Sequence, residues 1–244
     1  MRFGKLAPKL SYSTLRFSNY LDFSNLPTSP KAYDTLQAVY TKTGNHNPSH
    51  LFPMDGNDNY GDCTCAGIAH ALTLYNGLIG KTFIPTKDVV VREYLSLSGG
   101  EDSGLAELDV LHHFTRVGMF GHKGLAFVRL NPANLSFIKL AIFLFGGVYL
   151  GFQVQEDAIS DFQARKIWQP GKLTSEGHAV FATSYTPETV TLLTWGNTQV
   201  ASWKWWAQCV DECYAILPDE ALSTNYHPGF NLTHLKQDLA KLKS

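Results

Sequence analysis

Residues 57–78 read NDNYGDCTCAGIAHALTLYNGL, and the rest of the expected fold is arranged around them. The stretch begins with a polar turn in which Tyr60 is the one apolar residue. From Cys63 onward, apolar residues leave no consistently polar stripe, which predicts a helix buried on most sides. Cys63 therefore lies where a polar turn meets a buried helix. Amides and the dipole at a helix N-terminus lower the pKa of a thiol, so Cys63 is a candidate nucleophile.

Composition excludes several classes of function. The chain has 244 residues, with 20 Lys and Arg against 21 Asp and Glu, and no basic face recommends nucleic acid. No apolar run follows the basic residues of the first segment, so we expect no secretory signal. The most apolar run, residues 140–152, is shorter than the roughly 20 residues that cross a bilayer. Four cysteines are too few for a disulfide scaffold, so we expect a cytoplasmic protein with no membrane contact. Nothing in the sequence indicates an oligomeric state.

The periodicity changes along the chain, and this change predicts the domain organisation. Residues 1–56 carry five prolines and are expected to form an extended arm with one short helix. A helical lobe is expected over 57–135, a β-rich lobe over 136–218, and a polar tail with a short helix over 219–244. Helices followed by strands favour an α+β fold with two lobes, in which a central buried helix faces an antiparallel β-rich lobe. The expected helices are 30–40, 63–79, 86–96, 105–117, 134–145 and 232–242, and the expected strands are 124–130, 148–154, 177–185, 189–195, 199–203 and 213–217.

A second candidate for chemistry is His178, which follows Gly177 at the start of a predicted strand. Cysteine catalysis needs a thiolate, a histidine that takes and returns its proton, and donors for the oxyanion of the tetrahedral intermediate. An imidazole at the end of a strand can reach a facing helix. Cys63 and His178 are therefore predicted to form a catalytic pair.

These features resemble the papain-like cysteine peptidases. The family orders its residues as here: Cys63 at the head of the central helix, then Gly177-His178-Ala179-Val180, then a strand that ends in Trp195-Gly196. Asn57, six residues before Cys63, matches the family's oxyanion-hole side chain. The resemblance implies a papain-like fold and acyl-enzyme hydrolysis of a peptide or isopeptide bond in a peptide or protein substrate, with no cofactor. The Asn-Asp-x-x-Gly-Asp-Cys segment is also similar to that of bacterial and phage papain-like proteins, which implies an association with phage.

The chain departs from the family at several positions. Thr64 replaces the Trp that usually follows the nucleophile, and Leu193 stands where an Asn usually orients the histidine. Either Thr194 or Asn197 can take over that role. The first 56 residues lack the helical pattern of an inhibitory pro-region, so we do not expect the arm to block the site. An alternative function is therefore a papain-like binding or structural module, related to phage, that does not hydrolyse.

Other polar and aromatic residues have simpler interpretations. Cys65 and His70 are expected in the core, and Asp62 is expected to cap the helix with a charge that opposes the thiolate. The cysteine spacings C-x-C and C-x₃-C match structural zinc sites poorly, so no metal is expected. The remaining histidines and tryptophans are interpreted as packing or surface residues, with a substrate platform as the alternative for the tryptophans: His112, His113, His122, Trp203, Trp205 and Trp206.

Overall fold

Helix α3 (Cys63–Leu78) lies at the centre of the fold and is buried along almost its whole length. The computed structural model describes residues 1–9, 11, 14–218 and 229–243, so part of the expected tail, 219–228 and 244, lies outside the described residues. Gly67 lets α3 approach the sheet, because a Cβ there would lie 2.6 Å from the ring of Tyr149. The Tyr149 hydroxyl donates to the carbonyl of Thr64 (2.9 Å) and fixes this contact. The predicted central helix is confirmed.

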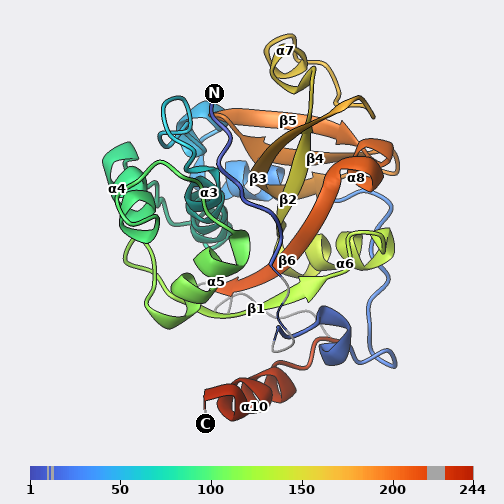
Figure 1. Cartoon of the computed structure of the whole chain (residues 1–244). Coiled ribbons are helices and arrows are strands. Elements are labelled where there is room, and N and C mark those ends of the chain that lie inside the picture. Colours follow the sequence, from blue (N-terminus) through green and yellow to red (C-terminus); the bar gives the residue numbers. More distant parts are fainter. Residues whose placement is uncertain (10, 12–13, 219–228, 244) are drawn as a thin grey trace.

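In the described part of the chain, six strands form one antiparallel sheet in the order β1-β6-β2-β3-β4-β5 (Figure 1). Trp195 and Gly196 connect β4 to β5 in a two-residue turn, and both have positive φ (47° and 73°), as a type I′ hairpin requires. The strands are β1 (Gly124–Leu130), β2 (Val148–Gln155), β3 (Leu173–Tyr185), β4 (Thr189–Thr194), β5 (Asn197–Ser202) and β6 (Val210–Pro218).

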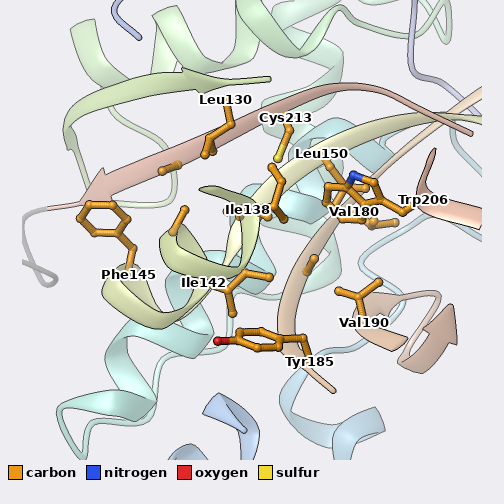
Figure 2. Close-up of a cluster of buried hydrophobic side chains, with 14 of the residues drawn as sticks. Leu130, Ile138, Ile142, Phe145, Leu150, Val180, Tyr185, Val190, Trp206 and Cys213 are labelled. Carbon is orange, nitrogen blue, oxygen red and sulfur yellow. The ribbon is translucent and has the colours of Figure 1, made fainter. Parts of the chain in front are cut away.

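The sheet separates two apolar cores. Along β2 and β3, alternate side chains point to opposite faces. Tyr149 and Phe181 belong to the core around α3, whereas Leu150 and Val180 belong to the core around α6. Figure 2 shows Ile138 and Ile142 of α6 against Leu150 and Val180 in this second core. The helices are η1 (Phe17–Tyr20), α1 (Thr35–Thr43), α2 (Pro48–Leu51), α4 (Lys87–Leu97), α5 (Glu107–Arg116), α6 (Leu135–Phe145), α7 (Ala158–Gln163), α8 (Trp203–Cys209) and α10 (Leu232–Lys243).

Two local predictions are wrong. The helix expected from Pro30 begins at Thr35, because Asp34 caps it by accepting the N–H of Gln37 (3.1 Å) while Tyr33 pairs with Tyr185 of β3. Trp203, expected as the last residue of a strand, is instead the first residue of helix α8, which was not predicted. The Ser202 hydroxyl accepts the N–H of Trp205 (3.1 Å) and starts this helix.

Candidate active site

Cys63 is the first residue of α3 and is 1% exposed. The groups near its sulfur include the backbone N–H groups of Ala179 and Gly4. Ala179 directly follows His178 in β3, so the strand that carries the histidine passes close to the side chain of the candidate nucleophile. No hydrogen bond joins the His178 ring to the Cys63 sulfur among the described residues, so the catalytic pair stays a prediction.

The His178 ring is held by the last residue of the neighbouring strand. Its Nε2 lies 2.8 Å from Oγ1 of Thr194, and its Nδ1 has no hydrogen-bond partner among the described residues. Asn197 does not compete for this position, because its side-chain oxygen accepts the N–H of Thr198 (2.9 Å). Of the two alternatives that the sequence leaves open, Thr194 is the residue that contacts the ring.

Three aromatic side chains enclose the same ring. Trp195 stacks on it with ring centres 4.7 Å apart and planes at 25°, and Phe152 and Phe3 meet it edge-on at 5.6 and 5.7 Å. This burial, with a smaller contribution from His70, lowers the pKa of His178 to about 3. The ring is therefore neutral at physiological pH in this structure.

Asn57 and Asp62 stabilise the turn before α3. The amide nitrogen of Asn57 donates to the carbonyl of Tyr60 (3.2 Å) and to Oδ1 of Asp62 (3.2 Å), so both of its N–H groups are occupied. An oxyanion role for Asn57 stays a prediction and requires one of these bonds to break. Burial raises the pKa of Asp62 to about 8, so the expected negative charge beside the thiol is largely absent at neutral pH.

The first six residues, called the arm segment below, cover the site. Figure 1 shows the start of the chain passing between helices α3 and α5 and strands β3 and β2. The expectation that the arm leaves the site open is wrong, because a blocking segment needs no helix when backbone hydrogen bonds hold an extended chain. Four such bonds do so here: Arg2 N–H to Asn57 O (2.8 Å), Leu105 N–H to Gly4 O (2.8 Å), Leu6 N–H to Leu105 O (2.9 Å) and Lys5 N–H to Gly177 O (3.2 Å).

Gly4 fits its position only because it lacks a side chain. A Cβ on Gly4 would overlap the backbone carbonyl of Gly61, and a Cβ on Gly104 would overlap the carbonyl of Gly4. Gly61 cannot easily retreat, since its N–H donates to Oδ1 of Asp102 (2.8 Å). The arm segment and the walls around it therefore touch backbone to backbone.

Lys5 places a buried ammonium group among carboxylates, which are called the acidic pocket below: Glu107 of α5 and Asp211 and Glu212 of β6. Its Nζ lies 3.2 Å from Glu212 and 3.0 Å from both oxygens of Asp211. The Lys5 side chain is 2% exposed, and Glu107 and Glu212 are fully buried. Burial alone would lower the pKa of Lys5, but the carboxylates outweigh it and raise that pKa.

The closed site holds a neutral pair. Burial raises the pKa of the Cys63 thiol to about 12, although the amides of Ala179 and Gly4 act in the opposite direction. With the His178 pKa lowered as well, the thiol keeps its proton and the imidazole does not take it. Burial thus disfavours both the thiolate and the imidazolium in this structure.

Other candidate residues lie in the core. Nε2 of His70 contacts the carbonyl of Pro53 (2.9 Å) and Oδ2 of Asp55 (3.1 Å), which confirms its interpretation as a packed histidine. The three tryptophans of α8 are buried, in agreement with packing rather than a substrate platform. All four cysteines are free and buried. Among the described residues, no three His, Cys, Asp or Glu side chains cluster in a way that could hold a metal ion. None of the described helices has the length and apolar character needed to cross a membrane.

Comparisons with known proteins identify the fold. Scans against protein-family models and curated proteins found no match. Among solved structures, xylellain, a cysteine protease from Xylella fastidiosa, superposes with a TM-score of 0.61 at 13% identity, covering 88% of this chain and 95% of that one. ProCathepsin B S9 from Trypanosoma congolense gives a TM-score of 0.60 at 10% identity, covering 89% and 86%. The cysteine protease and lectin-like domains of Cwp84 from Clostridium difficile give 0.55 at 13%, covering 84% and 56%. The chain has the papain-like α+β fold.

Proposed function

We propose that this chain is a thiol hydrolase that cleaves peptide or isopeptide bonds, and that the structure captures its latent state. The observation that carries the proposal is the arrangement around His178. One ring nitrogen is held by Thr194 at 2.8 Å, Trp195 stacks on the ring, and the amide of Ala179, the next residue in the strand, lies near the Cys63 sulfur. The other ring nitrogen is left without a hydrogen-bond partner among the described residues, as a general base needs.

In the open state, the proposed reaction proceeds by acyl transfer. Nδ1 of His178 takes the Cys63 proton, and the thiolate attacks the carbonyl carbon of the substrate. The resulting imidazolium returns the proton to the leaving amine as the C–N bond breaks, which leaves a thioester. Water then loses a proton to His178, attacks the thioester and releases the carboxylic acid and the thiol. The Cys63 amide and Asn57 are the proposed oxyanion donors, and Thr194 orients the ring.

The arm segment acts in this proposal as an inhibitor rather than as a substrate. The group that it places near the sulfur is the amide N–H of Gly4, whereas nucleophilic attack requires a carbonyl carbon. It also excludes the water that would stabilise an ion pair. Release of the arm segment is therefore the proposed activating step.

The test compares the four thiols in a variant with a displaced arm segment, Gly4→Ala. Iodoacetamide near pH 6 should label Cys63 at least tenfold faster than Cys65, Cys209 or Cys213, and adding His178→Ala should remove this advantage. The same variant should hydrolyse a casein or peptide-library substrate, and Cys63→Ala should abolish that hydrolysis. Equal, slow labelling of all four thiols together with no hydrolysis would refute the proposal.

A second candidate is a binding or structural module that does not hydrolyse. The neutral thiol and neutral imidazole of the closed state favour it, as does the use of both Asn57 N–H groups inside the turn. The same experiment separates the two. If displacing the arm segment leaves Cys63 as unreactive as Cys65, the module is the better description.

A further inference from the structure

The acidic pocket lies beside the candidate nucleophile. The backbone amide of Gly4 lies near the Cys63 sulfur, and Lys5, the next residue, fills the pocket. An extended chain advances about 3.3 Å per residue, so the pocket receives a side chain within about two residues of the group that meets the sulfur. A substrate that replaces the arm segment must therefore fill the same space.

We propose that the acidic pocket is a specificity site that selects a lysine or arginine side chain of the substrate next to the bond that is cleaved. The inference rests on the proposed function, because it presupposes that the chain has a substrate that it cleaves. The arm segment, in this view, inhibits by offering the pocket the basic side chain that a substrate would offer.

The charge of the pocket favours a cation. Glu107 and Glu212 are fully buried and adjacent, and burial together with their mutual repulsion raises the pKa of Glu107 well above its usual value. The Tyr214 hydroxyl donates to Glu212 (2.9 Å), which leaves the other oxygen for the ammonium group. Among the described residues, Lys5 is the one buried cation that acts on Glu107 and Glu212, so its departure leaves these carboxyl groups without a positive partner. A neutral or acidic side chain could not restore that balance.

The shape of the pocket favours a long, unbranched side chain. Gly151 of β2 lies opposite Glu212 of β6, and a Cβ on Gly151 would overlap the methylene carbons of Lys5. A Cβ on Gly177 would lie 2.5 Å from the carbonyl of Lys5. Two glycines thus open the sheet surface where the lysine stem enters. The depth suits a lysine stem, with Asp211 at the rim, 37% exposed, as a second partner for the charge.

Binding tests the pocket without requiring hydrolysis. The experiment uses the full chain with two substitutions: Lys5→Glu expels the arm segment by like-charge repulsion, and Cys63→Ala prevents turnover. This variant is titrated with the labelled peptide MRFGKLAP, the sequence of residues 1–8. A charge-assisted hydrogen bond predicts that this peptide binds about 10- to 100-fold more tightly than the same peptide with norleucine in place of lysine. Lys5→Ala in place of Lys5→Glu gives a second background in case the glutamate disturbs the fold.

A matched pair of variants locates the effect. Glu212→Gln should reduce the preference for lysine over norleucine to less than about threefold, because the ammonium loses its buried anionic partner. Glu156→Gln makes the same chemical change at an exposed carboxylate that pairs with Lys172, and it should leave the preference intact. Equal binding of the two peptides, or a preference that survives Glu212→Gln, would overturn the inference.

Cleavage separates this inference from the proposed function. With Lys5→Glu alone, a positional peptide library should show a preference for lysine or arginine at one position, and Glu212→Gln should remove it. Cleavage without any basic preference would leave the proposed hydrolase intact and overturn the pocket. Conversely, lysine-selective binding without cleavage and without fast Cys63 alkylation would overturn the hydrolase and leave the pocket as a recognition site.

Discussion

Gly4→Ala should convert the latent state into an open one. The added methyl group would overlap the Gly61 carbonyl, and Gly61 is anchored by its N–H bond to Asp102. The reverse contact is also close, since a Cβ on Gly61 would lie 3.0 Å from the Gly4 Cα. The arm segment, which is held by backbone hydrogen bonds and by the buried Lys5 side chain, must therefore move instead of the turn before α3.

The size of the effect follows from the bonds that this movement breaks. The new methyl group reaches ordinary contact distance only if the arm segment moves by about 1.5 Å. Its four backbone hydrogen bonds are 2.8–3.2 Å long, and this movement lengthens them beyond hydrogen-bond range. Each contributes about 0.5–1.5 kcal/mol net, so the docked state loses about 2–6 kcal/mol. The fraction of open molecules should rise about 30-fold or more.

The assay is the second-order rate of Cys63 alkylation by iodoacetamide at pH 7, with the site identified by peptide mass spectrometry. Gly4→Ala should raise this rate by about 30-fold or more over the unmodified chain. Gly171→Ala is the matched control, because a Cβ there meets its nearest neighbour, Gln155, at an ordinary 3.5 Å. A Gly4→Ala rate within threefold of the Gly171→Ala rate would show that the arm segment does not limit access to Cys63.

Three further outcomes are expected. In the Gly4→Ala background, Thr194→Val should slow Cys63 alkylation and peptide cleavage about tenfold or more with little change of the circular dichroism spectrum, because the ring loses the bond that orients it. The pKa of His178 lies at about 3, below that of an unfolded histidine, so unfolding takes up a proton. The free energy of unfolding should therefore fall as the pH drops from about 6.5 towards 3. Urea titrations at pH 7 and 4.5 should show a smaller fall for His178→Gln than for the unmodified chain, with a difference of at most about 3 kcal/mol. Asp55→Asn should lower the free energy of unfolding by about 2–4 kcal/mol in the same titrations, since it removes the buried partner of His70; an unchanged value would contradict that pairing.

The sequence predicts the elements whose periodicity is long and whose ends are marked. The buried helix α3 and the strand β1 appear with nearly the expected bounds. Helix α8 was not predicted, because Trp203 looks like the end of the preceding strand and only the Ser202 cap indicates a helix. Local patterns therefore give the framework, and single capping residues decide the ends.

The residues of the candidate site likewise fall into two groups, those recognised from local sequence and those that depend on distant contacts. Cys63 and His178 stand out because of their local surroundings, a helix head and a strand start. The choice between Thr194 and Asn197 depends on the geometry of a two-residue turn, which pairs them across β4 and β5 and directs only Thr194 to the ring. Gly4 and Lys5 give no local signal, because their role depends on Gly61, Gly177 and Glu212, which lie far away along the chain.

The contacts of the arm segment also set the order of events during synthesis. Lys5 emerges from the ribosome long before Gly177 and Glu212, the residues that receive its backbone and its side chain. Contacts across such long separations form late in folding. His178 lies in the same late-made strand as Gly177, so the proposed base is placed near Cys63 only when the docking place for the arm segment also exists. The arm segment has therefore already been synthesised when the candidate site first becomes complete.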